Sequence, residues 1–378
     1  MNRREVQEIR RRFSPEKDSI SHIYGCYVNA SGEIVARIDM PLGLMEQEEA
    51  EMYLKILKKS LSGSLGRNLM DIEFSTTQVE NSHEHRLLSS LRQSHLKDEN
   101  AREIFYSRVI ENIDFEEESY AILMAADSYD VPFKGSDDEV WEDGSSEVFD
   151  YIICAICPVK DARSELRYRS EDKTFRSAST GHVLSSPEAG FMFPAFDGRC
   201  ANIYGALYYS KNTSNIHEYI IETLFAPEKM PMAADVQKGA FGDALSEALG
   251  NDCSLDVVQA VHGEIREKLA AHKESKEPEQ PEIYMEEIGA VLKHNGVPEE
   301  KISFFNQVCR REMGDSQVFN PGNLVEAGRF EVKTPKVKIT VDPEFACDIE
   351  TGTINGKKYI LIPTEKGVSV NGIEIYIS

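Results

Sequence analysis

The sequence predicts an α+β protein with a mixed N-terminal domain, a helical middle segment and a small all-β module at its end. Three observations support this class. The 378 residues exceed the size at which one hydrophobic core usually stops growing, so two or three modules are expected. The first part of the chain contains both helical and strand-like apolar patterns, and the last part alternates polar and apolar residues by two. We therefore expect domains at 1–230, 231–325 and 326–378.

In the N-terminal domain, residues 46–61 show a helical pattern with acidic residues at the start and lysines near the end, as the helix dipole favours. Four apolar residues are expected to share one side of this helix: Met52, Ile56, Leu57 and Leu61. Further helices are predicted at 3–13, 85–96, 100–113 and 216–225, and strands at 20–29, 34–40, 69–74, 191–196 and 203–212.

Much of the acidity lies between two apolar strands, 119–131 and 148–159. Residues 111–150 contain fourteen Asp or Glu against one Lys. Two apolar strands around a long hydrophilic stretch predict a hairpin whose tip, at 133–147, is exposed and mobile. This acidic tip is one candidate surface for a basic protein partner.

The middle segment is predicted to be helical. Helices are expected at 233–249 and from residue 254, and the second runs into a charged, proline-bearing linker near 272–282. A helix pair follows at 283–297 and 298–314. The remaining residues alternate by two, and their Asn-Gly pairs predict the hairpin turns of a small all-β module.

Composition restricts the compartment and the kind of partner. The formal net charge of −23 repels nucleic acids and anionic membranes at long range, so a nucleic-acid role requires a locally basic face. No run approaches the roughly 18 to 20 consecutive apolar residues that a membrane span needs, and the start has no apolar stretch. The seven cysteines are odd in number and widely spaced, unlike a disulfide framework. We expect a cytoplasmic protein with reduced thiols.

Cys154 and Cys157 have the C-x-x-C spacing that metal sites and redox centres use. They lie in the apolar run 151–160, which is typical of a strand, whereas a redox pair normally opens a helix. Side chains three apart in a strand point to opposite faces, so these thiols cannot close on one metal unless the strand bends. A second C-x-x-C is absent. We interpret the pair as packing residues and predict no metal site.

No other motif identifies a reaction. His83 and His85 lack an acidic ligand at helical spacing, and we interpret them as a solvated loop and helix start. Gly63 and Gly66 separate a helix from a strand, whereas a phosphate loop joins a strand to a helix, so they predict a helix stop. The catalytic residues are unknown and no cofactor is predicted. A site assembled from distant residues around 193–200 stays a hypothesis.

The segment 160–176 has a positive net charge, in contrast to the strongly negative chain. Residues 161–190 are polar and irregular, and basic residues within 160–176 accompany Tyr168 and Phe175, so basic groups could meet phosphates while rings stack on bases. Four acids within 160–176 reduce its net charge to +2, and the alternative is a solvated loop balanced by the acidic residues at 137–150. The candidate nucleic-acid-binding residues are Lys160, Arg163, Arg167, Arg169, Lys173 and Arg176.

Segments along nearly the whole chain resemble the clostridial family catalogued as domain of unknown function 4317. The resemblance implies no known activity and no functional residues. The segments that carry it are 20–29, 61–74, 151–160, 191–212, 330–345 and 350–363.

The order of elements after residue 216 is also similar to that of bacterial nucleoid-associated proteins of the YejK type. Both have a helical segment, a helix pair and then a β tail of two or three hairpins, and residues 120–131 and 151–160 would correspond to central strands of that family's first domain. That family is associated with bacterial DNA, so the resemblance implies a nucleic-acid role.

We therefore expect a non-enzymatic, nucleoid-associated protein that binds nucleic acid or a nucleic-acid-bound partner. Two alternatives stay open. One is a hydrolase or other enzyme whose site is assembled from distant residues, and the other is a protein-interaction scaffold that uses the acidic hairpin.

Overall fold

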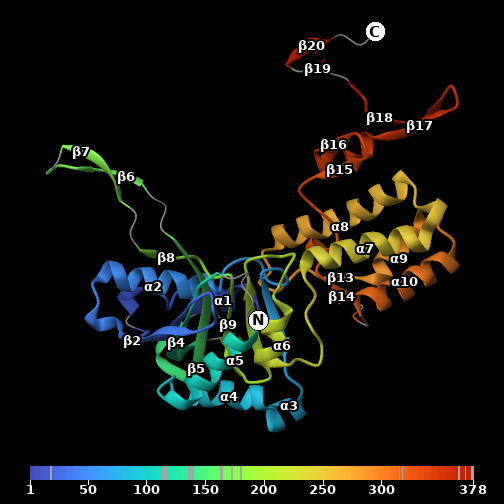
Figure 1. Ribbon diagram of the computed structural model, residues 1–378. Coiled ribbons are helices and arrows are strands. Elements are labelled where there is room, and N and C mark those ends of the chain that lie inside the picture. Colours follow the sequence, from blue (N-terminus) through green and yellow to red (C-terminus); the bar gives the residue numbers. More distant parts are fainter. Residues whose placement is uncertain are drawn as a thin grey trace. The chain divides into compact units, whose positions relative to one another are not determined.

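The computed structural model confirms the predicted α+β class (Figure 1). The chain divides into two compact units. The N-terminal unit comprises Met1–Ala233 with Pro278–Gln280, and the C-terminal unit comprises Ala234–Glu277 with Pro281–Ser378. The structure describes residues 1–17, 19–112, 118–134, 140–161, 165–171, 173–178, 181–314, 316, 318–364, 367–370 and 372–375.

One antiparallel sheet forms the centre of the N-terminal unit. Its strands are β1 (His22–Val28), β2 (Ile34–Pro41), β3 (Leu69–Glu73), β4 (Tyr120–Lys134), β5 (Val140–Asp161), β8 (His182–Leu184), β9 (Ala189–Phe193) and β12 (Gly205–Ser210). Among the described residues the order is β2-β1-β4-β5-β9-β12-β3, with β8 paired to the end of β5. The β4–β5 pair is the long hairpin predicted around the acidic stretch.

Helices cover both faces of this sheet and bury a separate core on each. One face packs against α1 (Arg3–Arg10) and α2 (Gln47–Lys59), and the other against α4 (His83–Gln93), α5 (Glu99–Asn112) and α6 (Glu218–Phe225). Figure 1 shows α2 on the opposite side of the sheet from α4 and α5. The short α3 (Thr76–Asn81) precedes α4. Burial on both faces explains why the central strands are almost continuously apolar, although many antiparallel sheets leave one face in water.

The buried face of α2 differs from the predicted one. Ala50, Leu54 and Leu57 are buried and Leu61 just beyond the helix is buried as well, whereas Met52 is 58% exposed. Residues at i, i+4, i+7 and i+11 share one helix face, which is the spacing of the buried set. The prediction was therefore wrong for Met52. A small residue such as Ala50 adds little to an apolar pattern, so the pattern favoured the larger methionine.

Residues 161–190, predicted to be irregular, contain strands. β6 (Glu165–Arg169) and β7 (Thr174–Ala178) form an antiparallel ribbon, and within the described residues they pair only with each other. β8 also falls in this stretch and joins the main sheet. The prediction of an irregular segment was therefore wrong for these residues. Further along the chain, β10 (Ala195–Asp197) and β11 (Cys200–Asn202) make another short hairpin.

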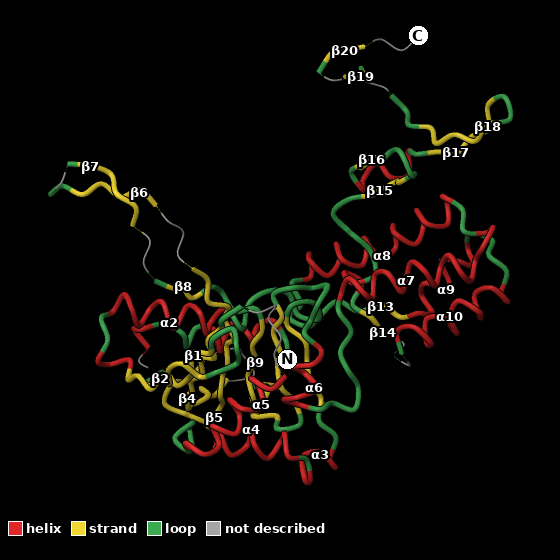
Figure 2. Tube along the Cα trace, in the orientation of Figure 1, coloured by secondary structure: helices red, strands yellow, loops and turns green. Residues whose placement is uncertain are grey.

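The C-terminal unit contains the predicted helices, followed by hairpins (Figure 2). Phe241 and Phe305 meet edge to face with ring centroids 6.0 Å apart and join two of these helices. The second helix continues to Ser275, so the charged linker begins later than predicted. The elements are α7 (Ala234–Leu249), α8 (Leu255–Ser275), α9 (Met285–His294), α10 (Glu299–Met313), the strand pair β13 (Ile283–Tyr284) and β14 (Val318–Phe319), and the hairpin strands β15 (Phe330–Lys333), β16 (Lys338–Val341), β17 (Glu350–Ile354), β18 (Lys357–Leu361), β19 (Val368–Val370) and β20 (Ile373–Ile375).

Asn355 and Gly356 both have positive φ, as the predicted Asn-Gly hairpin turn requires. The second predicted turn includes Asn371, which lies outside the described residues. Strands β4 and β5 extend into the predicted tip at 133–147, and residues 135–139 between them lie outside the described residues, so an exposed, mobile tip stays a prediction. In the part of the chain that the structure describes, no helix has the length and apolar character to cross a membrane.

Candidate functional site

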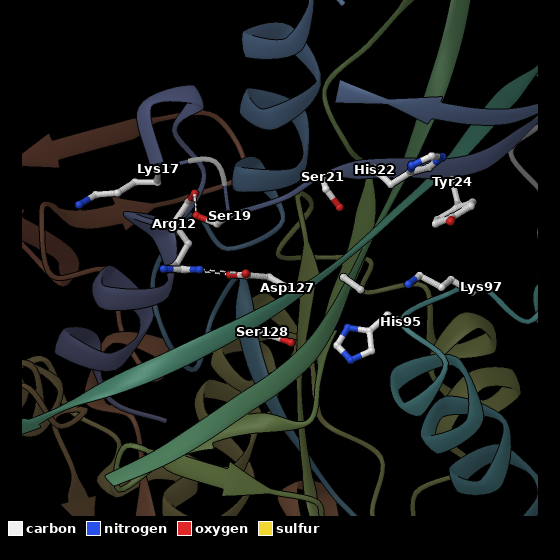
Figure 3. A pocket seen from close by; sticks show the side chains of 11 residues that line it. Arg12, Lys17, Ser19, Ser21, His22, Tyr24, His95, Lys97, Asp127 and Ser128 are labelled. Atoms are coloured by element: carbon white, nitrogen blue, oxygen red, sulfur yellow. Dashed lines mark hydrogen bonds and ion pairs between the residues drawn. The ribbon is translucent and has the colours of Figure 1, made fainter. Parts of the chain in front are cut away.

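A polar cavity of about 340 Å³ lies in the N-terminal unit, where the end of α1, strands β1 and β4, and the connection between α4 and α5 come together (Figure 3). Most of its lining side chains carry charges, imidazole rings or hydroxyl groups. The cationic side chains are Arg12, Lys17 and Lys97, and the hydroxyl groups come from Ser19, Ser21, Tyr24 and Ser128.

An ion pair between a buried carboxylate and a partly buried guanidinium forms one wall of the cavity. Asp127 of β4 is 3% exposed, and the guanidinium of Arg12 donates to its Oδ2 from Nε at 2.8 Å and to its Oδ1 from Nη2 at 2.9 Å. The hydroxyl of Tyr151 donates to Oδ2 at 3.0 Å. The hydrogen bond to Asp127 raises the pKa of Arg12, and burial raises the pKa of Tyr151. Arg12 therefore stays charged, Tyr151 stays a neutral donor, and the carboxylate charge is neutralised within the protein.

His95 and Lys97 reach the cavity from a strained turn between α4 and α5. His95 (φ +48°) and Leu96 (φ +62°) are consecutive non-glycine residues in the left-handed region, which costs about 1–2 kcal/mol each. Leu96 is fully buried and its carbonyl oxygen accepts a hydrogen bond from Arg102, so the surrounding packing holds the turn. Nε2 of His95 lies 3.8 Å from Oδ1 of Asp150. Strain of this kind gathers at functional sites, and here it sets the position of two cavity residues.

An aromatic stack supports the opposite wall. The ring of His22 stacks on Tyr24 with centroids 4.6 Å apart, and the guanidinium carbon of Arg102 lies 4.4 Å from the centroid of the same tyrosine ring. Nε2 of His22 lies 2.5 Å from Oδ1 of Asp39. Each cavity imidazole is thus held beside a carboxylate that does not itself line the cavity.

The cavity is locally cationic although the chain is strongly acidic. Three cationic side chains and one carboxylate line it, a net of +2 if the imidazoles are left out of the sum, against −23 for the whole chain. The carboxylate, Asp127, is already paired with Arg12. Over the described residues, Lys17 and Lys97 have no acidic partner. A cavity with these walls fits a small hydrophilic anion better than an apolar ligand.

The β6–β7 ribbon is the second candidate for a functional site. Tyr168 and Phe175 are register partners whose rings meet at 5.4 Å between centroids, and they are 57% and 63% exposed. Leu166, two residues before Tyr168, is 70% exposed. Register partners share a face and neighbours along a strand alternate, so these positions form one apolar face of the ribbon.

The predicted nucleic-acid-binding residues are only partly brought together. Arg167 of β6 is the register partner of Arg176 in β7, and Arg169 is the register partner of Thr174. Lys173 lies in the turn between the strands with φ +52° and is exposed. Lys160 belongs to β5, where its Nζ lies 3.8 Å from Oε1 of the exposed Glu118. Arg163 lies outside the described residues.

The C-x-x-C pair is part of a strand, as predicted. Cys154 and Cys157 lie in β5, and they belong to the cores on opposite faces of the sheet. Burial raises the pKa of both thiols, which therefore stay protonated. Their placement is that of packing residues.

His85 is buried, so its interpretation as solvated was wrong. One ring nitrogen, Nε2, lies 2.9 Å from the carbonyl oxygen of Ile203, and the ring meets Phe74 edge to face at 5.1 Å. The ring fills the core between α4 and the sheet. His83, at the first position of α4, is exposed as expected.

An enzyme site assembled from distant residues was hypothesised around 193–200. In the structure the charged residues of this stretch make structural contacts. Arg199 forms an ion pair with Glu8 at 3.0 Å and donates to the carbonyl oxygen of Pro132 at 2.9 Å. Asp197 lies in the β10–β11 hairpin. Neither Asp197 nor Arg199 lines the polar cavity, so this geometry adds no support for the enzyme hypothesis.

The cavity residues could not be predicted from the sequence, because no local motif joins them. Arg12 and Asp127 are 115 residues apart, and the α4–α5 turn was predicted only as the end of a helix. The sole signal was the polar sequence 94–99 between two helices.

Comparison with known proteins gives a family. The sequence pattern described as "Domain of unknown function (DUF4317)" matches residues 1–373, and the chain belongs to this family. A search of the curated proteins finds no match.

Proposed function

We propose that this family member is a cytoplasmic, non-enzymatic protein that binds single-stranded nucleic acid through the β6–β7 ribbon. The observation that carries the proposal is the exposed Tyr168–Phe175 pair on a ribbon whose strands also contain Arg167, Arg169 and Arg176. Rings that stack on bases, combined with cations that meet phosphates, are typical of binding with little sequence preference. The similarity in element order to nucleoid-associated proteins favours the same class of partner.

The exposed apolar face needs a physical explanation. Full burial of a large apolar side chain contributes roughly 1.5–3 kcal/mol, and Leu166, Tyr168 and Phe175 all forgo most of it. An isolated two-stranded ribbon is at best marginally stable in water. A ligand that covers the rings would recover part of this free energy and stabilise the ribbon.

The charge of the chain favours a single strand over a duplex. The chain carries −23 and the segment 160–176 only +2, so long-range repulsion must be offset by short-range contacts. Unpaired bases offer their faces to Tyr168 and Phe175, whereas the stacked bases of a duplex do not. We therefore expect weak, salt-sensitive binding of single strands and weaker binding of duplexes.

The test is fluorescence anisotropy of the full chain with a labelled single-stranded oligonucleotide across a salt series. The variants are Tyr168→Ala, Phe175→Ala and both together. Loss of one stacked base costs about 1–3 kcal/mol, so each single variant is expected to weaken binding roughly 5- to 150-fold. The matched control is Phe345→Ala, which removes a ring that is 58% exposed in the C-terminal unit.

Two further measurements separate the possible outcomes. Replacing Arg167 and Arg176 with Gln should make the salt dependence shallower, by about 0.7 in the slope of log K against log salt for each lost phosphate contact. If the ribbon instead docks a protein, the wild-type chain would not change the anisotropy of the labelled oligonucleotide even at low salt, and that result would remove the proposal.

A further inference from the structure

The polar cavity is independent of the ribbon and points to a second ligand. We propose that it binds a small molecule through a phosphate group. The site is defined by Lys97 and His95 from the α4–α5 turn, His22 and Ser21 from the β1 side, and Arg12 at the end of α1.

The charges around the cavity favour an oxyanion. The carboxylate of Asp127 accepts two hydrogen bonds from Arg12 and one from Tyr151, so it is already satisfied. The ammonium group of Lys97 points toward the interior of the cavity in Figure 3, and no described acidic residue pairs with it. Lys17 lines the far rim, where in this view its ammonium group points outward. An anion between Lys97 and Arg12 would meet cations from two directions.

The donors around the cavity favour phosphate over a simpler anion. The hydroxyl group of Ser21 and the two imidazole rings line the same space as Lys97, whereas the hydroxyl of Ser128 already donates to Asp150. A phosphate group offers several acceptor oxygens in a tetrahedral arrangement, and donors that converge from different elements can reach different oxygens at once. A carboxylate has only two oxygens in one plane and would leave some of these donors unused.

The size of the cavity restricts what the phosphate is attached to. A volume of about 340 Å³ lies at the lower end of the range for small-molecule sites. The walls are mostly polar, so the attached group is expected to carry hydroxyls rather than a hydrocarbon chain. A phosphorylated small polyol or sugar fits this chemistry.

The turn at His95 and Leu96 is a separate observation that points to the same site. Two consecutive non-glycine residues in the left-handed region are strained, and burial of Leu96 together with the Arg102 hydrogen bond holds them there. The chain thereby presents His95 and Lys97, on either side of the buried Leu96, to one cavity. Such preorganisation lowers the entropic cost of binding a ligand.

The test is isothermal titration calorimetry of the full chain with ribose 5-phosphate, inorganic phosphate and ribose as separate probes. Binding of both phosphate-bearing probes, with ribose inactive, is the expected result. Lys97→Ala should weaken binding of both roughly tenfold, since it removes one charge-assisted hydrogen bond. Lys97→Arg should retain most of the affinity because it keeps the charge.

The controls test folding and location. Lys97 is exposed, so its replacement should not alter the thermal unfolding midpoint. Lys59→Ala removes a lysine of α2 that does not line the cavity and should leave binding unchanged. Phe175→Ala should also bind the probes normally, which distinguishes this site from the ribbon.

Three results would overturn the inference. The first is that neither phosphate-bearing probe gives detectable heat at about 10 mM, which is tenfold above a Kd of about 1 mM. The second is that ribose binds as strongly as ribose 5-phosphate, and the third is that the Lys97→Ala variant binds the phosphate-bearing probes as strongly as wild type.

Discussion

Asp127 is the residue whose surroundings give the sharpest prediction for stability. It is buried and accepts hydrogen bonds from Arg12 and Tyr151, so its removal leaves a partly buried cation and a buried hydroxyl without their acceptor. Breaking a buried pair in this way costs about 3–5 kcal/mol. We expect Asp127→Ala to lower the free energy of unfolding by that amount, measured from the urea midpoint.

Two variants check the cause of this loss. Tyr151→Phe keeps the ion pair and removes one hydrogen bond, so it should cost only about 0.5–1.5 kcal/mol. Asp39→Ala removes the 61%-exposed partner of His22 and should cost less than about 1 kcal/mol. If Asp127→Ala and Asp39→Ala lowered the free energy of unfolding equally, burial would not be the cause of the large effect expected at Asp127.

Single residues were predictable from the sequence where the argument was local. The opposite placement of Cys154 and Cys157 followed from the two-residue period of a strand, which needs no knowledge of the partner strands. The pairing of Arg12 with Asp127 could not be predicted, because it depends on where α1 lies against β4. The same holds for His95, whose neighbours across the cavity come from β1 and β4.

At the scale of elements, the pairing of β1 with β4 depends on a glycine. A Cβ atom on Gly25 would lie 2.1 Å from the carbonyl oxygen of Ile122 in the next strand, and backbone cannot move aside as a flexible side chain can. Gly25→Ala should therefore destabilise the N-terminal unit by about 1–3 kcal/mol or more, the cost of overpacking a well-packed site.

The measurement is the urea midpoint of Gly25→Ala beside that of Gly43→Ala. Gly43 is exposed and does not adopt positive φ, and a Cβ atom added to it would meet no heavy atom within 4 Å, so its replacement should be close to neutral. A Gly25→Ala protein as stable as wild type would show that β1 and β4 can separate without cost.

Elements with a buried face were predictable, and those without one were harder. The helices and central strands were identified because burial imposes a period on apolar residues. For α2 the helix was predicted correctly, and only the assignment of Met52 to its buried face was wrong. The β6–β7 ribbon was missed although Leu166, Arg167, Tyr168 and Arg169 alternate by two. The stretch is rich in charged residues and has no buried apolar face among its described residues, so no core-facing period of apolar residues marks it as a strand pair.

At the scale of the whole molecule, both proposals describe cationic or aromatic surfaces on an acidic chain. The 65 acidic residues exceed the 42 basic ones by 23, and most of this excess has no opposite charge to pair with. Self-repulsion of like charges destabilises the compact state, and salt screens it. Exposed ion pairs such as Arg37 with Glu103 respond in the opposite sense, but each contributes only about 0–1 kcal/mol.

We therefore expect repulsion to dominate and salt to stabilise the protein near neutral pH. Raising sodium chloride from about 10 mM to 150 mM shortens the screening length from about 30 Å to 8 Å. A gain of about 1 kcal/mol corresponds to roughly 2–4 °C in Tm for domains of 150–250 residues, which calorimetry resolves. Near the sequence pI of about 4.9 the net charge approaches zero, so the same salt series should change Tm far less. A Tm that falls with salt at pH 7 would instead show that specific ion pairs outweigh the net charge, and the acidic surface would then be a network that holds the fold together.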